Sequence, residues 1–187
     1  FFLAIGLREL PPFTLVLTRV GFSALLLLGW AAIAGIRLPP RSVWGAFVVL
    51  ALLNNVIPFA LYAFAQQQIS SGLTSILNAT TPLWGVIVAH LFTVDERATA
   101  GKIAGVLLGF AGVATMVGGD ALAGLGANVF AQAACLVATL SYALAGVWAR
   151  RFKGQGVTPM GVATGQLVAA KGVLPPGAGS GGRPPLV

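Results

Sequence analysis

Two asparagine–proline pairs with the same spacing are the residues of this sequence best suited to build a polar binding site. Pro58 follows Asn54 by four residues, and Pro82 follows Asn78 by four residues, each inside a long apolar stretch. Because proline has no N–H, the carbonyl four residues before it loses its helical donor. An unpaired carbonyl in lipid costs several kcal/mol unless protein or water satisfies it. Each pair therefore predicts a broken, polar helix centre.

Other polar and aromatic side chains accompany the two breaks. Discontinuous helices in the middle of the membrane are typical of transporter binding sites, which predicts a shared cavity. The candidate cavity residues are Arg19, Asn54, Asn55, Tyr62, Asn78, Thr81 and Trp84, with Pro58 and Pro82 as the helix breaks. The alternative for the asparagines is a hydrogen-bonded clasp between kinked helices. The alternative for Tyr62 and Trp84 is core packing.

Arg19 is the one charged candidate in this set. It lies roughly 10 Å below the outer membrane surface if the first long helix begins at Pro12. An arginine at that depth is costly and becomes a functional hypothesis, either as a contact for an anionic substrate group or as a clasp to a neighbouring helix. The alternative is a long side chain that reaches back to the headgroups.

The elements that must position these residues are predicted to be transmembrane helices. Apolar residues make up 57% of the chain and charged residues only 8%, whereas a soluble domain carries about 25% charged residues. A membrane span needs roughly 20 apolar residues. Five stretches meet that length: 12–34, 43–66, 72–93, 98–118 and 126–149. We also expect part of a helix at residues 1–7 and the start of another at 158–170.

The basic residues between these stretches predict the topology. Loops on the cytoplasmic side carry an excess of Lys and Arg. The even-numbered loops hold seven basic residues and the odd-numbered loops one: Arg37, Arg41, Arg97, Lys102, Arg150, Arg151 and Lys153 against Arg8. The even-numbered loops are therefore predicted to be cytoplasmic.

The fourth long stretch carries a row of glycines. Gly101, Gly105 and Gly109 recur every four residues, with Gly112 close behind. Small residues at this spacing let helices pack closely in membranes. The pattern predicts a packing face, either within one protomer or between two protomers.

Several classes of function are disfavoured by what the sequence contains. The single Cys135 and single His90 offer no cluster for a metal, and the basic residues form no patch for nucleic acid. The sequence has no Gly-x-Ser-x-Gly motif, and Gly118-Gly119-Asp120 lacks the Gly-x-Gly-Asp spacing of aspartyl intramembrane proteases. We therefore predict no enzyme, no cofactor, no metal and no nucleic-acid partner.

A set of local motifs in a fixed order resembles the EamA family of the drug/metabolite transporter superfamily. The motifs are Ile69-Ser70-Ser71-Gly72-Leu73-Thr74-Ser75-Ile76-Leu77, Thr81-Pro82-Leu83-Trp84, Asp95-Glu96, Gly101-Lys102-Ile103-Ala104-Gly105 and Gly109-Phe110-Ala111-Gly112-Val113. Arg19 after Leu17-Thr18 and the segment Asn55 to Tyr62 match the preceding helices of that family. The resemblance covers about residues 1–170.

The resemblance implies an all-α, polytopic bundle with a nearly complete five-helix repeat at 1–120 and the start of a second, inverted repeat at 121–170. The Gly/Pro-rich end at 171–187 is either a disordered tail or a truncated or misread end, and the second is favoured because the half-helix before it cannot span a bilayer. The implied function is a multi-pass carrier or exporter of amino acids or related solutes in the plasma (inner) membrane, with this chain a fragment not competent alone.

The alternative function is a non-transporting scaffold or partner subunit that packs through its glycine-rich helix. The expected partners are the lipid bilayer and a small solute. The candidates for the glycine face are a second copy of the chain or C-terminal helices that lie outside this sequence.

Overall fold

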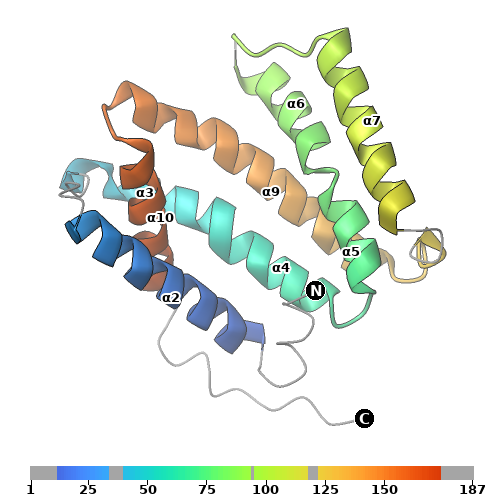
Figure 1. Ribbon diagram of the computed structural model, residues 1–187, viewed down its shortest axis with the longest axis horizontal. Helices are drawn as coiled ribbons and strands as arrows, with labels where there is room; N and C mark the ends of the chain where they lie inside the picture. Colours follow the sequence, from blue (N-terminus) through green and yellow to red (C-terminus); the bar gives the residue numbers. More distant parts are fainter. Residues whose placement is uncertain (1–11, 34–39, 94, 118–121, 174–187) are drawn as a thin grey trace. The chain divides into compact units, whose positions relative to one another are not determined.

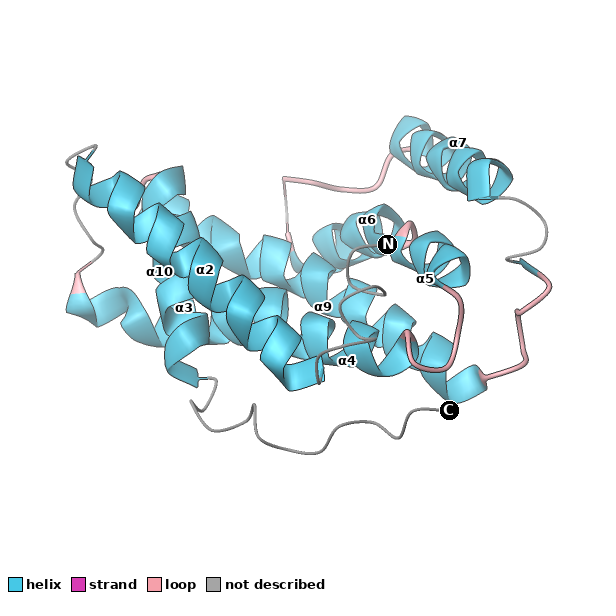
Figure 2. Cartoon of the chain, turned by 60° about the horizontal axis from the view of Figure 1, so that its bottom comes forward, coloured by secondary structure: helices cyan, strands magenta, loops and turns pink. Residues whose placement is uncertain are grey.

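Every element described in the structure is a helix (Figure 2). The computed structural model describes residues 12–33, 40–93, 95–117 and 122–173; for residues 12–20, 31, 41, 171 and 173 it describes the backbone alone. These ranges contain no strand, so the prediction of an all-α fold is confirmed. The expected stub at 1–7 and residues 174–187 of the tail lie outside the described ranges.

The helices follow the predicted apolar stretches. Within the described residues, four helical spans are long and apolar enough to cross a membrane: Trp44–Ala65, Ser71–Phe92, Ala100–Val117 and Val129–Gly154. Helix α2 (Pro12–Ile33) adds 22 residues, and its fully described part contains the apolar segment Gly21–Trp30. The predicted start of a further helix is α10 (Pro159–Val173). The chain is therefore a multi-pass membrane protein.

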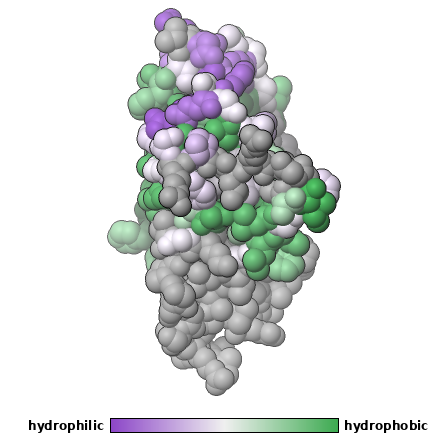
Figure 3. Space-filling view, turned by 90° about the vertical axis from the view of Figure 1, so that its left-hand side faces the viewer, coloured by the Kyte–Doolittle hydropathy of each residue, from purple (hydrophilic) through white to green (hydrophobic). Residues whose placement is uncertain are grey.

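Large apolar side chains lie on the surface of these helices. Met116 is 82% exposed and Phe130 is 84% exposed, and exposed apolar residues form broad green areas in Figure 3. Helix α7 (Ala100–Val117) has no buried residue at all within its bounds. Soluble monomers rarely expose contiguous apolar patches larger than a few hundred Å². A lipid environment accounts for this surface.

The chain divides into two compact units, and the division falls inside α4 (Ile57–Ala65) and α9 (Val129–Gly154). We call residues 61–147 the α7 unit, and residues 2–60 with 148–187 the α10 unit. This grouping by contacts is different from a division into sequence repeats, so the predicted repeats at 1–120 and 121–170 stay a prediction.

The α10 unit is built around close packing of α10 against α2 and α3 (Trp44–Ala51) (Figure 1). A short 3₁₀ turn, η1 (Arg41–Val43), precedes α3. The fully buried Phe47 ring stacks on the Phe152 ring with centroids 4.3 Å apart. A side chain at Gly165 would place its Cβ 2.8 Å from Cε1 of Phe47. A larger residue at 165 would therefore require the Phe47 ring or the helices to shift.

The α7 unit contains α5 (Ser71–Asn78) and α6 (Thr81–Phe92), both of which pack beside α7 (Figure 1). Ser70 caps α5, because its side chain accepts a hydrogen bond from the N–H of Leu73 at 3.2 Å. Asn128 caps α9 in the same way through the N–H of Ala131 at 3.0 Å. These caps satisfy N–H groups that a helix start leaves unpaired.

Candidate functional site

The break at Pro58 takes the form of a π-helical turn, η2 (Leu52–Val56), between α3 and α4. The N–H of Ile57 donates to the carbonyl of Leu52, five residues back. Such a turn accommodates one residue more than an α-helical turn, and π-bulges are frequent at functional sites. Asn54 and Asn55 both lie on this turn. The predicted irregularity before Pro58 is therefore present.

The two amides on the π-helical turn have different surroundings. Asn54 is half-buried, and its Nδ2 donates to Oε1 of Gln166 on α10 at 2.9 Å. Asn55 is only 5% exposed. Its Nδ2 has no hydrogen-bond partner among the described residues. One amide is thus paired across helices, and the neighbouring amide offers a buried donor.

The break at Pro82 has a different form. Helix α5 ends at Asn78, Ala79 and Thr80 form a turn, and α6 restarts at Thr81. Pro82 is therefore in the first turn of a new helix, where a missing N–H leaves no helical bond unmade. The discontinuity at Pro82 therefore takes the form of a helix restart.

The groups freed at this second break are satisfied by nearby hydroxyls. Thr81 Oγ1 donates to the backbone carbonyl of Asn78 at 2.7 Å. The hydroxyl of the buried Tyr62 donates to Oδ1 of Asn78, also at 2.7 Å. The Tyr62 ring stacks on Tyr142 with centroids 6.3 Å apart. Asn78, whose side chain is exposed, thus accepts hydrogen bonds at the helix break through both of its oxygens.

The predicted cavity residues fall into two groups, one in each unit. The α10 unit contains Arg19, Asn54 and Asn55, and the α7 unit contains Tyr62, Asn78, Thr81 and Trp84. The structure brings Tyr62, Asn78 and Thr81 together, whereas Trp84 is half-buried on α6. Arg19 lies within α2, where the structure describes only the backbone at this position. That the seven residues line one cavity stays a prediction.

The sequence analysis missed Gln166. It is the only amide side chain in the apolar run of α10, and that isolation was the available signal. Its partner, Asn54, is 112 residues away in the sequence. No spacing rule connects residues at such a distance.

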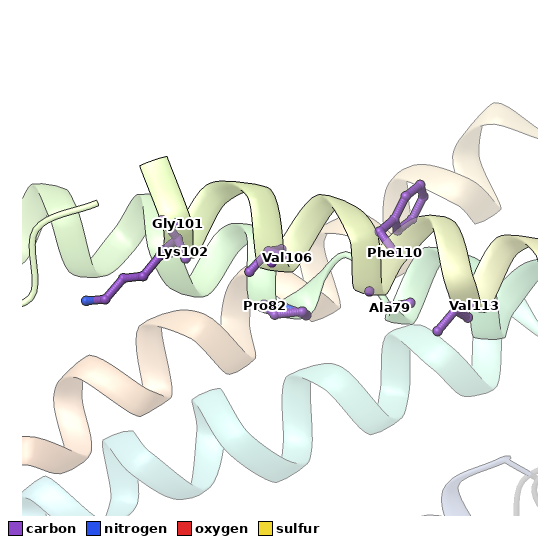
Figure 4. A pocket seen from close by; sticks show the side chains of 10 residues that line it. Ala79, Pro82, Gly101, Lys102, Val106, Phe110 and Val113 are labelled. Carbon is purple, nitrogen blue, oxygen red and sulfur yellow. The ribbon is translucent and has the colours of Figure 1, made fainter. Parts of the chain in front are cut away.

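The glycine face of α7 borders an open apolar groove of about 590 Å³ (Figure 4). Gly101, Gly105 and Gly109 line it together with Ala79, Pro82 and Val86 from the neighbouring segments. A Cβ added at any of the four glycines, Gly112 included, would meet nothing within 4 Å. The described residues therefore do not fill the glycine face, and its packing partner stays a prediction.

Helices broken at polar residues and a surface suited to lipid define a membrane protein of transporter type. Residues 1–118 match the model of the EamA-like transporter family. That match covers more than half of the chain, and the chain therefore belongs to this family.

Curated relatives carry transporter names. The chain is 27% identical over 176 residues to "Uncharacterized inner membrane transporter YedA" of Escherichia coli (strain K12), covering 93% of this chain and 55% of the relative. It is 36% identical over 117 residues to "Uncharacterized transporter" of Archaeoglobus fulgidus, covering 62% of this chain and 39% of the relative. No solved structure matches the chain.

The comparisons and the structure agree on where the protein resides. The chain spans about half the length of the curated relatives it matches. An inner-membrane relative, a membrane family and four apolar spans confirm the prediction of a multi-pass protein of the plasma (inner) membrane.

Proposed function

We propose that this chain is part of a secondary transporter of small metabolites such as amino acids and related solutes, and that it catalyses no chemical reaction. The observation that carries the proposal is an irregularity in each of two consecutive spans, a π-helical turn in one and a helix restart in the other, with carboxamide side chains at both. Broken spans with exposed polar groups are costly in lipid and are typical of solute sites. Membership of a transporter family supports the same function.

The proposed site consists of the residues predicted from the sequence: Arg19, Asn54 and Asn55 of the α10 unit, and Tyr62, Asn78, Thr81 and Trp84 of the α7 unit. The proposed mechanism is alternating access, in which one repeat rocks against the other around the bound solute. The repeats at 1–120 and 121–170 are part of this proposal. Because the relatives are longer, we propose that the complete carrier includes helices outside this sequence.

The test is solute flux through the protein, expressed with its native flanking sequence and reconstituted in proteoliposomes. The probe is a panel of ¹⁴C-labelled L-amino acids. We expect Arg19→Ala and Asn54→Ala each to lower flux at least about tenfold, because each removes a polar side chain of the proposed site. Both variants should still insert into the membrane in normal amounts.

The matched controls are Arg97→Ala and Gln155→Ala, which change the same kinds of side chain at exposed loop positions. Normal flux in both site variants would contradict the proposed cavity. The groove on α7 supports the other candidate, a scaffold subunit that packs through its glycine face. That candidate predicts no flux for any solute and a stable complex that Gly105→Leu disrupts.

A further inference from the structure

Three carboxamides lie on the π-helical turn and on α10, which contacts this turn. Asn54 and Asn55 are adjacent on η2, and Gln166 reaches Asn54 from α10 through a 2.9 Å hydrogen bond. All three lie in the α10 unit. Asn54 and Gln166 are half-buried, whereas Asn55 lies deeper. The backbone of Asn55 is therefore one residue away from the Asn54–Gln166 pair.

A purely structural clasp does not account for this arrangement. The bond between Asn54 and Gln166 is enough to join the two helices. Asn55 Nδ2 is buried without a partner within the described structure, and an unsatisfied buried donor costs roughly 1–3 kcal/mol. Most buried polar groups in proteins are paired, so an exception needs an explanation. A solute acceptor group that occupies the site for part of the transport cycle supplies one.

The chemistry of the three side chains restricts that acceptor group. Asn55 presents N–H groups, and Gln166 keeps its own amide N–H groups to donate, because its oxygen accepts from Asn54. The described residues of the α10 unit include no Asp or Glu, whereas they include basic residues such as Arg19; Glu9 of the same unit lies outside the described residues. A cationic solute would find no counter-charge among these described residues. An anionic oxygen would find several donors.

We propose that Asn55 and Gln166, with Asn54 as the residue that positions Gln166, bind the carboxylate group of the transported solute. This assignment rests on the proposed function and adds to it Gln166 and a substrate class, solutes that carry a carboxylate. The N–H groups of the two amides donate to the carboxylate oxygens. Hydrogen bonds to a charged group are stronger than those between neutral groups, so a carboxylate gains more here than a neutral carbonyl.

The decisive variant is Gln166→Glu. A carboxylate at this position still accepts the hydrogen bond from Asn54, so the link between η2 and α10 is kept. It has no N–H group to offer and repels an anionic solute. Gln155→Glu is the matched control, because it makes the same change at an exposed position between α9 and α10. Asn55→Leu is the second variant, since it removes the buried donor without adding a charge.

The experiment measures counterflow in proteoliposomes that contain the protein with its native flanking sequence. The probes are ¹⁴C-labelled L-amino acids and monocarboxylates, with their carboxamide derivatives and tetraethylammonium as competitors. We expect flux of carboxylate solutes and no competition by the carboxamides or the cation. Gln166→Glu and Asn55→Leu should each raise the solute concentration at half-maximal flux at least about tenfold. Gln155→Glu should leave this concentration unchanged.

The outcomes separate this assignment from the proposed function. Normal flux in Gln166→Glu would make Gln166 a clasp only and would overturn the assignment while leaving transport intact. Equal competition by carboxamides or tetraethylammonium would overturn the carboxylate specificity. If Gln166→Glu does not accumulate in the membrane, normal flux in Asn55→Leu would overturn the assignment in its place. Absence of flux for every probe would overturn the proposed function together with this assignment.

Discussion

The two asparagine–proline pairs have the same spacing, but the polar groups beside one of them are hydrogen-bonded and a buried amide beside the other is not. At Pro82 in the α7 unit, the carbonyl and side-chain oxygen of Asn78 both accept bonds from hydroxyl groups. At Pro58 in the α10 unit, the neighbouring Asn55 keeps a buried donor without a partner among the described residues. The sequence motif therefore indicates an interruption of the helix, and the local partners decide whether the amide beside that interruption is hydrogen-bonded.

The form of the backbone explains the difference. At Pro82 the chain ends one helix and starts another, which places the proline in a first turn where no donor is missed. At Pro58 the helix continues through a π-helical turn. Such a turn keeps the span continuous but changes the direction in which its side chains point.

The largest effect expected from this comparison is that two similar substitutions differ in how they change the free energy of unfolding. Asn78→Leu leaves the buried Tyr62 hydroxyl without its acceptor, so we expect a loss of about 1–3 kcal/mol in unfolding free energy. Asn55→Leu removes an unsatisfied buried donor, so stability should be unchanged or higher. Thermal unfolding in detergent micelles, followed by tryptophan fluorescence, measures both.

A double substitution checks the cause of the Asn78 effect. Tyr62→Phe removes the hydroxyl that Asn78→Leu would leave unpaired, so the double variant should recover most of the loss. Equal destabilisation by Asn78→Leu and Asn55→Leu would show that the two breaks do not differ in the way described.

The next effect concerns the rigidity of the α10 unit. Gly165→Ala should lower stability by about 1–3 kcal/mol, because its Cβ would press on the buried, stacked Phe47 ring. Gly45→Ala on α3 is the matched control, since a Cβ there meets nothing within 4 Å. Unfolding midpoints compare the two. A tolerated Gly165→Ala would mean that α10 and α3 are free to move apart.

The smallest effect concerns the carbonyl freed by Pro82. Thr81→Val should cost about 1 kcal/mol, because the hydroxyl that donates to Asn78 is lost while the shape is kept. Thr81→Ser keeps the hydroxyl and should preserve most of the stability. The unfolding midpoints of the two variants decide the point, and a Thr81→Val protein as stable as the Thr81→Ser protein would refute the role of this bond.

The helices were predictable because lipid requires long apolar stretches. The predicted stretch 12–34 corresponds to α2, and 98–118 corresponds to α7, within two residues at each end. The locations of the breaks were also predictable, since proline removes a donor wherever it stands. The difference between a π-helical turn and a helix restart was not, because both follow from the same Asn–Pro spacing.

The features that could not be predicted from the sequence depend on contacts between distant segments. Nothing in the sequence links Gln166 to Asn54, because their contact exists only once α10 lies beside η2. The same holds for Gly165 and Phe47. The glycine face of α7 was visible in the sequence as a repeat of four residues. What fills it depends on neighbours that the described residues do not provide.

The π-helical turn also has a consequence for comparing this chain with its relatives. It is equivalent to one residue inserted into an α-helix, so a relative with a regular helix there would be one residue shorter between Trp44 and Pro58. A one-residue gap in an alignment at 52–56 would then mark family members that lack the adjacent pair of amides on this turn. Insertion length, rather than residue identity, becomes the trait by which the family can be sorted.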